Sequence, residues 1–166
     1  MSFLDDVFGR NPTRDWQPQR GLELVCDLDN ETFCGVAFGE RVERLSKLGP
    51  TEVAGTARKG IYEYPSRGFT CIAEDGKFVE VELSFVDEAP LAVFGGIVQH
   101  RGRPVPLSRA TTETEVRAAF GDPRERKEQG IGGEPFVQLT YGLYRSDWIF
   151  AFEDGGLDSL WGGRKD

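Results

Sequence analysis

The spacing of apolar residues alternates between two patterns along the chain, which predicts short helices followed by groups of strands. Apolar residues recur three or four positions apart in ERVERLSKLGP (residues 40–50) and in TTETEVRAAFGDP (residues 111–123), as on one side of a helix. Both runs end in glycine and proline, which stop a helix. Thr112 and Glu115 also have the spacing of a capping box. The apolar sides of the two predicted helices are Val42, Leu45 and Leu48, and Val116, Ala119 and Phe120.

After each helix the spacing changes to alternation, which is typical of strands with one buried side. Residues 69–73 run into Glu74-Asp75-Gly76, and residues 148–152 run into Glu153-Asp154-Gly155, at a constant offset of 79 residues. Asp-Gly between alternating runs predicts a hairpin turn, because both residues of that turn need positive φ. The repeated Glu-Asp-Gly is therefore predicted to be one turn built twice. The residues predicted to face the helices are Phe69, Cys71, Val81, Trp148 and Phe150.

The same order of elements recurs in both halves of the chain. LELVC and TFCGV (residues 22–36) precede the first helix as a predicted strand pair, and LAVFGGIVQ and PVPLS (residues 91–108) precede the second. Each half is therefore predicted to be a β-β-α-β-β-β unit. The predicted fold class is α+β, with antiparallel meander sheets and short helices packed on one face. The predicted segments are an N-terminal appendage at 1–20, repeat 1 at 21–88, repeat 2 at 89–161 and a polar tail at 162–166.

Two local features complete this plan. Gly49 and Gly121, which end the helices, are 72 residues apart, whereas the turns are 79 apart, so the second half has gained seven residues. We place these seven around EQGIGGE (residues 128–134). In the appendage, one amphipathic turn is predicted from Phe3, Leu4, Val7 and Phe8.

A short helix that ends in a glycine-proline step, followed by an antiparallel meander and then repeated, resembles the tandem-repeat fold of the β-lactamase inhibitor proteins. A single unit is similar to the small outer-membrane assembly lipoproteins. The resemblance rests on EVRAAFGDP with the meander from Phe136 to Trp161, and on ERLSKLGP with Tyr64 to Phe85. The sequence differs from both families because it shows no secretory signal, lipid-attachment cysteine or paired repeat cysteines. The resemblance implies a sheet that binds proteins rather than one that catalyses a reaction.

The net charge of −8 is concentrated in the first half of the chain. Residues 21–88 contain fourteen acidic and seven basic residues, whereas residues 89–161 contain ten and eight. An acidic surface repels phosphate backbones, and a nucleic-acid binder is expected to carry a basic patch. We therefore expect no nucleic-acid partner, and the charge favours a basic protein partner.

Hydropathy predicts a protein that is neither secreted nor embedded in a membrane. The longest apolar run, residues 89–98, is about half the length that a membrane-spanning helix needs. Asp5 and Asp6 lie where a signal peptide carries positive charge. We therefore expect a cytoplasmic protein with no membrane partner.

Patterns that would indicate catalysis or metal binding are weak. CDLDNETFC (residues 26–34) has alternating carboxylates, but Thr32 and Phe38 occupy the places where an EF-hand loop needs Gly and Glu. A Ser-His or Cys-His enzyme would need His100, the only histidine, which is predicted in a polar loop between strands. GIGGEP (residues 130–135) precedes a predicted strand, whereas a phosphate loop precedes a helix. We therefore expect no metal or other cofactor.

The cysteines and the acidic turns leave two further interpretations. Cys26, Cys34 and Cys71 match no zinc-binding spacing and no C-x-x-C pair, which predicts reduced, partly buried thiols. The alternative function is a carboxylate-based hydrolase or metal-dependent enzyme, with Asp and Glu residues from both repeats and a site between them. A small-ligand pocket between the repeats also stays open.

The polar sides of the strands are the leading candidate for a functional surface, because an antiparallel sheet covered on one side leaves the other side free. The residues of this side are Thr70, Ile72, Glu80 and Glu82, with Gln138, Thr140 and Ser159 from the second half. Tyr62, Tyr64 and Arg67 are residue types that anchor interfaces, although tyrosine in strands is also ordinary packing. We therefore predict a non-enzymatic, acidic protein-binding module, inhibitor-like or immunity-like, that uses an exposed sheet face.

Overall fold

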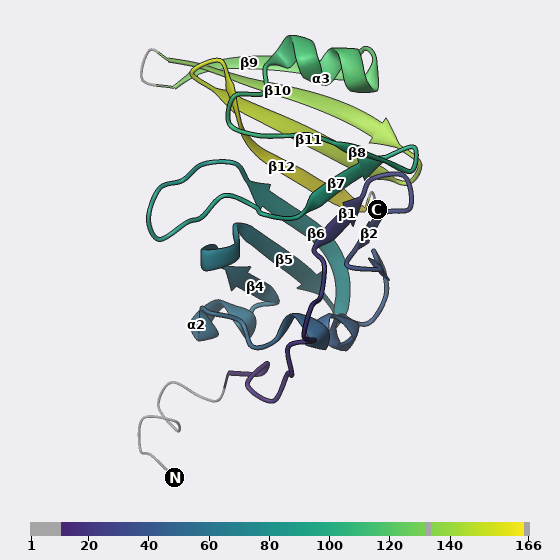
Figure 1. Cartoon of the computed structure of the whole chain (residues 1–166), viewed down its shortest axis with the longest axis vertical. Helices are drawn as coiled ribbons and strands as arrows, with labels where there is room; N and C mark the ends of the chain where they lie inside the picture. The colour runs from purple at the N-terminus through teal and green to yellow at the C-terminus, as the bar shows by residue number, and fades with distance from the viewer. Residues whose placement is uncertain (1–10, 132–133, 165–166) are drawn as a thin grey trace.

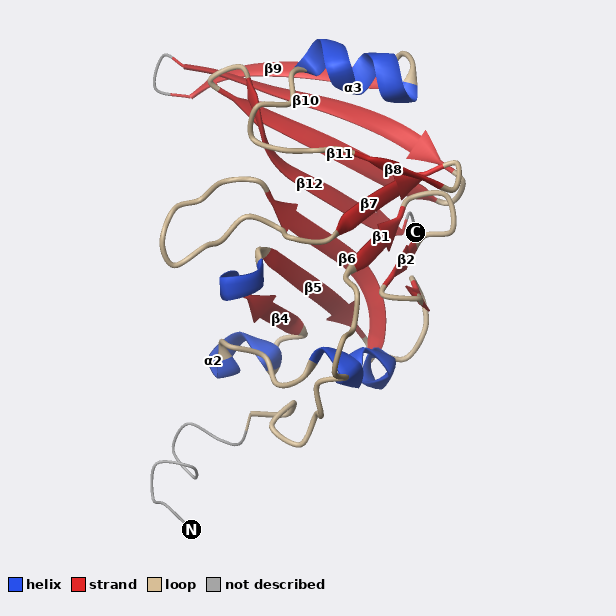
Figure 2. Ribbon diagram, viewed as in Figure 1, coloured by secondary structure: helices blue, strands red, loops and turns tan. Residues whose placement is uncertain are grey.

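The computed structural model describes residues 11–131 and 134–164 of the chain (Figure 1). These residues form two β-sheets and a few short helices, so the described part is mostly β, compatible with the predicted α+β class (Figure 2). The small sheet has the strand order β3-β2-β1-β7-β8, and the large sheet has the order β4-β5-β6-β12-β11-β10-β9. Figure 1 shows the small sheet in front of the middle of the large sheet.

The small sheet joins the first strands of the two halves. β1 pairs antiparallel with β2 and parallel with β7, where Cys26 lies opposite Val98. The strand predicted over residues 91–99 is shorter than expected, because only its last part, β7, is extended in the sheet. The strands are β1 (Val25–Asp27), β2 (Thr32–Phe33), β3 (Val36–Ala37), β7 (Ile97–His100) and β8 (Arg103–Val105).

The large sheet contains both predicted meanders, joined edge to edge. β6 pairs antiparallel with β12, with Leu83 opposite Leu160. β9 is an additional strand at the edge of the second meander, and it overlaps the segment where the sequence predicts seven extra residues. β12 continues to Arg164, so residues 162–164 are strand and not a polar tail. The strands are β4 (Ile61–Tyr64), β5 (Phe69–Glu74), β6 (Lys77–Ser84), β9 (Glu125–Ile131), β10 (Glu134–Leu143), β11 (Ser146–Glu153) and β12 (Gly156–Arg164).

The first predicted helix is a 3₁₀ helix, η1 (Val42–Leu48). Its apolar residues are three positions apart, and side chains at this spacing align along a 3₁₀ helix. All three are buried, as predicted. Two short helices follow it, α2 (Ala54–Ala57) and η2 (Pro65–Arg67).

The second predicted helix is α3 (Glu113–Phe120), and its capping box is confirmed. The Thr112 N–H donates to Glu115 Oε2 at 2.8 Å, and the Glu115 N–H donates to Thr112 Oγ1 at 3.3 Å. Ala119 was expected on the apolar side of this helix, but it is exposed. The side of α3 that packs on the protein is narrower than predicted, because Val116 is buried and Phe120 is half-buried.

The core lies between the large sheet and a layer made of the small sheet and the helices. Phe33 of the small sheet contacts Phe69 with ring centroids 5.0 Å apart, and Phe120 of α3 contacts Phe150 at 4.9 Å. Phe38 lies against both halves of the large sheet, at 5.0 Å from Phe78 and 5.7 Å from Trp148. The residues predicted to face the helices are all buried, namely Phe69, Cys71, Val81, Trp148 and Phe150.

Both Glu-Asp-Gly segments form two-residue hairpin turns, as predicted. Glu74 lies opposite Lys77 and Glu153 opposite Gly156 in the strand register. The central residues have positive φ in both turns, at 49° and 73° in the first and 53° and 75° in the second. The register also shifts at equivalent places, between Ile72 and Ala73 and between Ala151 and Phe152.

The described part of the N-terminal appendage packs on the fold. The Thr51 N–H donates to Thr13 Oγ1 at 2.8 Å, and Trp16 stacks on Tyr62 with ring centroids 5.4 Å apart. Residues 11–16 therefore contribute to the packing around β4. The amphipathic turn predicted from Phe3, Leu4, Val7 and Phe8 lies outside the described residues.

Candidate functional site: the outer face of the large sheet

The strand register brings the predicted polar sides of both halves together on one face of the large sheet. One row of neighbouring positions runs Thr70, Glu82, Trp161, Ile149 and Thr140 across five strands. A second row runs Ile72, Glu80, Gly163 and Asp147. We call this side the outer face. The core aromatic residues lie on the opposite side, so the small sheet and the helices leave the outer face uncovered within the described ranges.

A hollow of about 180 Å³ lies in the outer face where β6, β12 and β11 run side by side. Gly163 stands between Glu80 and Asp147 in the register and has no side chain to fill this space. A Cβ atom at Gly163 would lie 3.3 Å from Glu80 Cγ. The hollow is lined by Glu80, Asp147, Ile149, Trp161, Gly163 and Arg164.

The charge of the outer face is most strongly negative along β6. Burial raises the pKa of Glu80, and nearby Glu82 and Glu74 raise it further. Burial also raises the pKa of Glu82, with a contribution from Asp158. No ion pair of Glu80 or Glu82 is found in the described ranges, so no described residue neutralises their charges.

Acidic residues closer to β9 do have cationic partners. Arg124 Nη2 lies 2.8 Å from Asp147 Oδ2, and Lys127 Nζ lies 3.2 Å from Glu125 Oε2. Glu80 and Glu82, on the first-half side of the outer face, have no such partner among the described residues. This matches the excess of acidic residues in residues 21–88.

Tyr62, Tyr64 and Arg67 were proposed as interface anchors, but they contact the core instead of the outer face. Tyr64 is 1% exposed, and its hydroxyl donates to the Gly49 carbonyl at 2.8 Å. Arg67 donates to the Leu48 carbonyl at 2.8 Å and lies over the Tyr64 ring. These residues are therefore structural, because alternate positions of β4 point to the core and the 3₁₀ helix ends beside it.

Two other predicted residues of the outer face offer little contact area. Thr140 and Ser159 lie on the predicted side, but they are 7% and 6% exposed. The Trp161 Nε1–H donates to Ser159 Oγ at 2.8 Å, which holds the indole ring along the strand. Gln138 is half-buried on the same side. The accessible outer face is therefore centred on β6 and β12.

The central residues of the hollow lie outside the set of residues predicted for the sheet face. Trp161 was placed at the end of repeat 2 and Gly163 in a polar tail, so neither was assigned to the sheet face. Alternation continued from Leu160 through Trp161 to Gly163 would have placed both on the polar side. Asp147 and Ile149 alternate with the buried Trp148, and this alternation would likewise have placed them on the polar side of the sheet.

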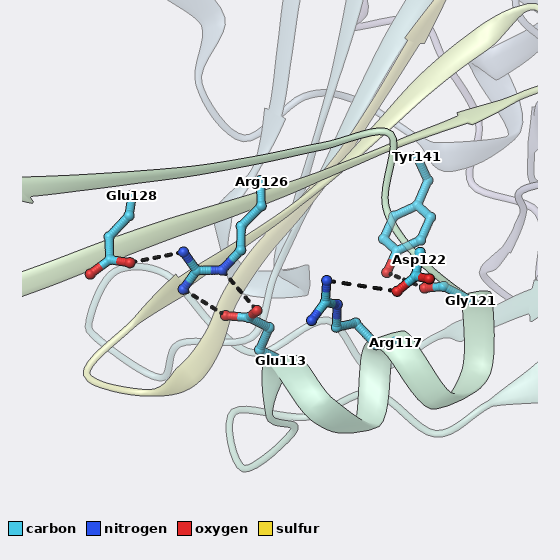
Figure 3. Close-up of polar contacts among 7 residues, drawn as sticks. All are labelled: Glu113, Arg117, Gly121, Asp122, Arg126, Glu128 and Tyr141. Atoms are coloured by element: carbon cyan, nitrogen blue, oxygen red, sulfur yellow. Dashed lines mark hydrogen bonds and ion pairs between the residues drawn. The ribbon is translucent and has the colours of Figure 1, made fainter.

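A separate set of contacts fixes α3 against the edge of the large sheet (Figure 3). Arg126 Nε donates to Glu113 Oε1 at 2.9 Å, and Arg126 Nη1 donates to Glu128 Oε2 at 2.8 Å. The Tyr141 hydroxyl donates to the Gly121 carbonyl at the end of the helix, at 3.0 Å. These charges bind one another within the chain, so this cluster positions the helix.

The carboxylates of residues 26–34 bind backbone groups instead of forming a metal site. Asp27 Oδ1 accepts the Asn30 N–H at 3.1 Å, and Glu31 Oε1 accepts the Arg145 N–H at 2.6 Å. Asp29 accepts the Arg101 N–H. Within residues 11–131 and 134–164, no group of three His, Cys, Asp or Glu residues could hold a metal ion.

His100 differs from its predicted place in a polar loop. It is the last residue of β7, it is 8% exposed, and its ring lies 4.8 Å from the ring of Phe120. Nδ1 is 3.1 Å from Asp29 Oδ1 without forming a hydrogen bond. His100 is therefore packed between the small sheet and α3.

The three cysteines are free and buried, as predicted. Burial raises the pKa of each of the thiols of Cys26, Cys34 and Cys71. A thiol with a raised pKa is a poor nucleophile at neutral pH, because the thiolate is the reactive form. These residues therefore act as small apolar groups in the core.

The two Glu-Asp-Gly turns cannot form one shared site. Each turn directly precedes a strand, β6 or β12, and these strands run antiparallel. Their starts therefore lie at opposite ends of the large sheet. When the pairing of Leu83 with Leu160 is continued along both strands, Asp154 lies fourteen residue positions from Asp75. At about 3.3 Å per residue, this separation is roughly 45 Å.

GIGGEP lies in the β9–β10 hairpin, with Gly132 and Gly133 outside the described residues.

An apolar cavity of about 410 Å³ lies where the end of β6 meets β7 and β8. It is at the junction of the two halves, where the sequence left a ligand pocket open. Its lining contains no ionisable side chain, so it offers no acid, base or nucleophile. It is lined by Phe85, Phe94, Gly96, Ile97, Val98, Pro104, Val105, Pro106 and Leu107.

Comparison with known proteins gives little further information. No family model and no curated protein matches the chain. Among solved structures, a DUF4309 family protein (YjgB) from Bacillus subtilis is similar, with 13% sequence identity and a TM-score of 0.48. The alignment covers 93% of this chain and 92% of that chain. A likeness this low carries no argument about function.

Among the described helices, none combines the length and hydrophobicity needed to cross a membrane.

Proposed function

We propose that this protein is a non-enzymatic, cytoplasmic binding module that holds a basic protein partner on its outer face. The observation that carries the proposal is the position of Glu80 and Glu82 on an uncovered sheet face, where no described residue forms an ion pair with either of them. Glu80 is half-buried and Glu82 is exposed, two positions apart on the same strand. Neighbouring carboxylates repel, and a cationic partner would relieve this repulsion. Inhibitor-like or immunity-like action fits such a surface.

The alternative function, a carboxylate-based or metal-dependent enzyme, receives no support from the positions of the acidic residues that suggested it. The repeated acidic turns lie at opposite ends of the sheet, and the carboxylates of residues 26–34 bind backbone N–H groups. No observation favours a particular reaction. We therefore propose binding as the function.

We also propose that the two halves descend from a duplicated unit, in line with the resemblance to the β-lactamase inhibitor proteins. Matched contacts support this proposal. Tyr64 donates to the Gly49 carbonyl, and Tyr141 donates to the Gly121 carbonyl. The two glycines have φ of 83° and 82°. The hairpin turns and the register shifts are likewise equivalent in the two halves.

The proposed function is tested with a defined basic probe. A lysine-rich decapeptide is titrated into ¹⁵N-labelled protein, with a glutamate-rich peptide as the opposite-charge control. We expect chemical-shift changes on β5, β6 and β12 for the basic peptide, and weaker binding at higher salt.

A matched pair of charge reversals locates the binding surface. Glu80→Lys with Glu82→Lys should weaken binding of the lysine-rich peptide at least tenfold. Glu23→Lys with Glu43→Lys makes the same change of net charge at exposed positions in the layer that covers the opposite side of the sheet, and it should have less effect. Equal losses in the two double variants would show that only net charge matters and would contradict the proposed surface.

A further inference from the structure

We infer that the hollow over Gly163 binds an arginine side chain of the basic partner. This inference rests on the proposed function and names the group that the outer face recognises. The hollow combines an open floor, an aromatic side and a carboxylate side. Arginine fits this combination because its planar guanidinium binds a carboxylate through two N–H groups and also stacks on aromatic rings.

The floor of the hollow is open because of Gly163. Glu80 and Asp147 flank this glycine on the two neighbouring strands. Neighbouring strands are about 4.8 Å apart, so the two flanking backbones are about 10 Å apart. A side chain at position 163 would occupy the space between them, since a Cβ there already approaches Glu80 Oε2 to 3.3 Å.

Trp161 forms the aromatic side of the hollow. It is two residues before Gly163 on the same face, and Ile149 lies opposite it on β11. The hydrogen bond from its indole to Ser159 fixes the ring before a ligand arrives. In the described ranges, arginine side chains lie over the rings of Tyr64, Phe69 and Tyr144, but none lies over Trp161.

The charges around the hollow favour a cation from outside the chain. Glu80 has no ion pair in the described ranges, whereas Asp147 is already held by Arg124 at 2.8 Å. Glu80 is therefore the acceptor we assign to the guanidinium. The side chain of Arg164 extends to Gly39, where its guanidinium approaches the glycine closely. The charge complementarity thus selects a basic side chain over a neutral or acidic one.

The experiment compares three decapeptides in which serine alternates with arginine, lysine or citrulline. Citrulline has the shape of arginine without its charge. Binding is followed by the backbone resonances of residues 80, 147 and 163 and by the indole resonance of Trp161. We expect the arginine peptide to bind at least threefold more tightly than the lysine peptide and the citrulline peptide to cause no shift.

Two glycine substitutions provide the matched test. Gly163→Val fills the hollow, and Gly130→Val adds the same side chain on β9, where a Cβ atom meets nothing within 4 Å. Gly163→Val should weaken binding of the arginine peptide at least tenfold, while Gly130→Val leaves it unchanged. Trp161→Leu is a second variant, which removes the aromatic ring and should weaken arginine binding more than lysine binding.

The outcomes separate this inference from the proposed function. If Gly163→Val binds the arginine peptide as tightly as Gly130→Val does, or if lysine and arginine peptides bind equally, the arginine site is overturned. The proposed function would still stand in that case, provided that Glu80→Lys with Glu82→Lys weakens binding of the lysine-rich peptide at least tenfold. If no basic peptide shifts the outer face, both are overturned.

Discussion

Two tyrosine hydroxyls hold the ends of the main helices. Tyr64 donates to Gly49 at the end of η1, and Tyr141 donates to Gly121 at the end of α3. The last carbonyl groups of a helix have no partner within the helix, so a side-chain donor satisfies one of them. The tyrosines that looked like interface anchors in the sequence thus serve the fold instead.

Replacing Tyr64 with phenylalanine should therefore destabilise the protein. The Gly49 carbonyl is buried and would lose its donor, which costs about 1–2 kcal/mol in the free energy of unfolding. Tyr62→Phe is the control, because Tyr62 is a buried tyrosine of the same strand whose ring stacks on Trp16. Urea denaturation measures both. Equal stability of Tyr64→Phe and the wild type would contradict this role.

The carboxylates of β6 predict an unusual pH dependence. The pKa values of Glu80 and Glu82 are raised in the folded protein, so the folded state binds protons more readily than the unfolded state. Their contribution to stability is then best below the ordinary glutamate pKa of about 4.3 and falls as the pH rises through the raised pKa values. A positively charged partner would reverse this penalty.

Replacing both glutamates with glutamine tests whether their ionisation destabilises the folded protein. Glu80→Gln with Glu82→Gln should raise the free energy of unfolding at pH 7, by about 0.5 kcal/mol for half-exposed groups. The gain should vanish near pH 4, where the wild-type carboxyls are protonated as well. Denaturant midpoints at the two pH values measure it, and a gain that is larger at pH 4 would contradict the argument.

At the scale of elements, α3 depends on its capping box. Eight-residue helices are marginal by themselves, so satisfied N–H groups in the first turn matter. Thr112→Ala removes the hydroxyl that accepts from Glu115 and should cost about 1 kcal/mol. Thr114→Ala, at an exposed position inside the same helix, should leave stability unchanged or slightly raised. Thermal denaturation compares the two, and equal losses would contradict the capping role.

The helices and turns that could be predicted from the sequence are those whose formation depends on residues close together in the chain. The spacing of three residues between Val42, Leu45 and Leu48 matches the three residues per turn of a 3₁₀ helix, although from the sequence it predicts only a helix of unspecified type. The Asp-Gly turns were predictable because positive φ restricts the residue types at those positions. β9 was missed because its sequence, ERKEQGI, lacks the alternation of a half-buried strand.

At the scale of the whole molecule, Phe38 connects the two halves. Its ring contacts Phe78 from the first half and Trp148 from the second, and β6 pairs with β12 directly beneath. We therefore expect the two halves to unfold together. A duplicated unit that folded independently would instead show two transitions.

Phe38→Ala tests this connection. Deleting a buried aromatic side chain should cost about 3–5 kcal/mol in the free energy of unfolding, with fluorescence and circular dichroism still following one transition. Tyr144→Ala is the control, because Tyr144 is 80% exposed and its loss should change stability by less than about 0.5 kcal/mol. Two separated transitions in the wild type would contradict the shared core.

The outer face was predictable only in part. Thr70, Ile72, Glu80 and Glu82 follow from alternation along single strands, and the structure brings them together. Their meeting with Trp161, Ile149 and Asp147 depends on the pairing of β6 with β12, which joins residues that are far apart in the sequence. The hollow exists only because this pairing sets Gly163 between two carboxylates.

The sequence by itself determined the local elements of this protein: the helix ends, the capping box, the hairpin turns and the buried side of each central strand. These depend on φ preferences and on side-chain spacing among neighbours in the chain. Only the tertiary structure decided the parallel pairing of β1 with β7, the joining of the two meanders and the hollow over Gly163. Such contacts depend on which strand edges pair and on how the aromatic core packs, and no local pattern contains that information.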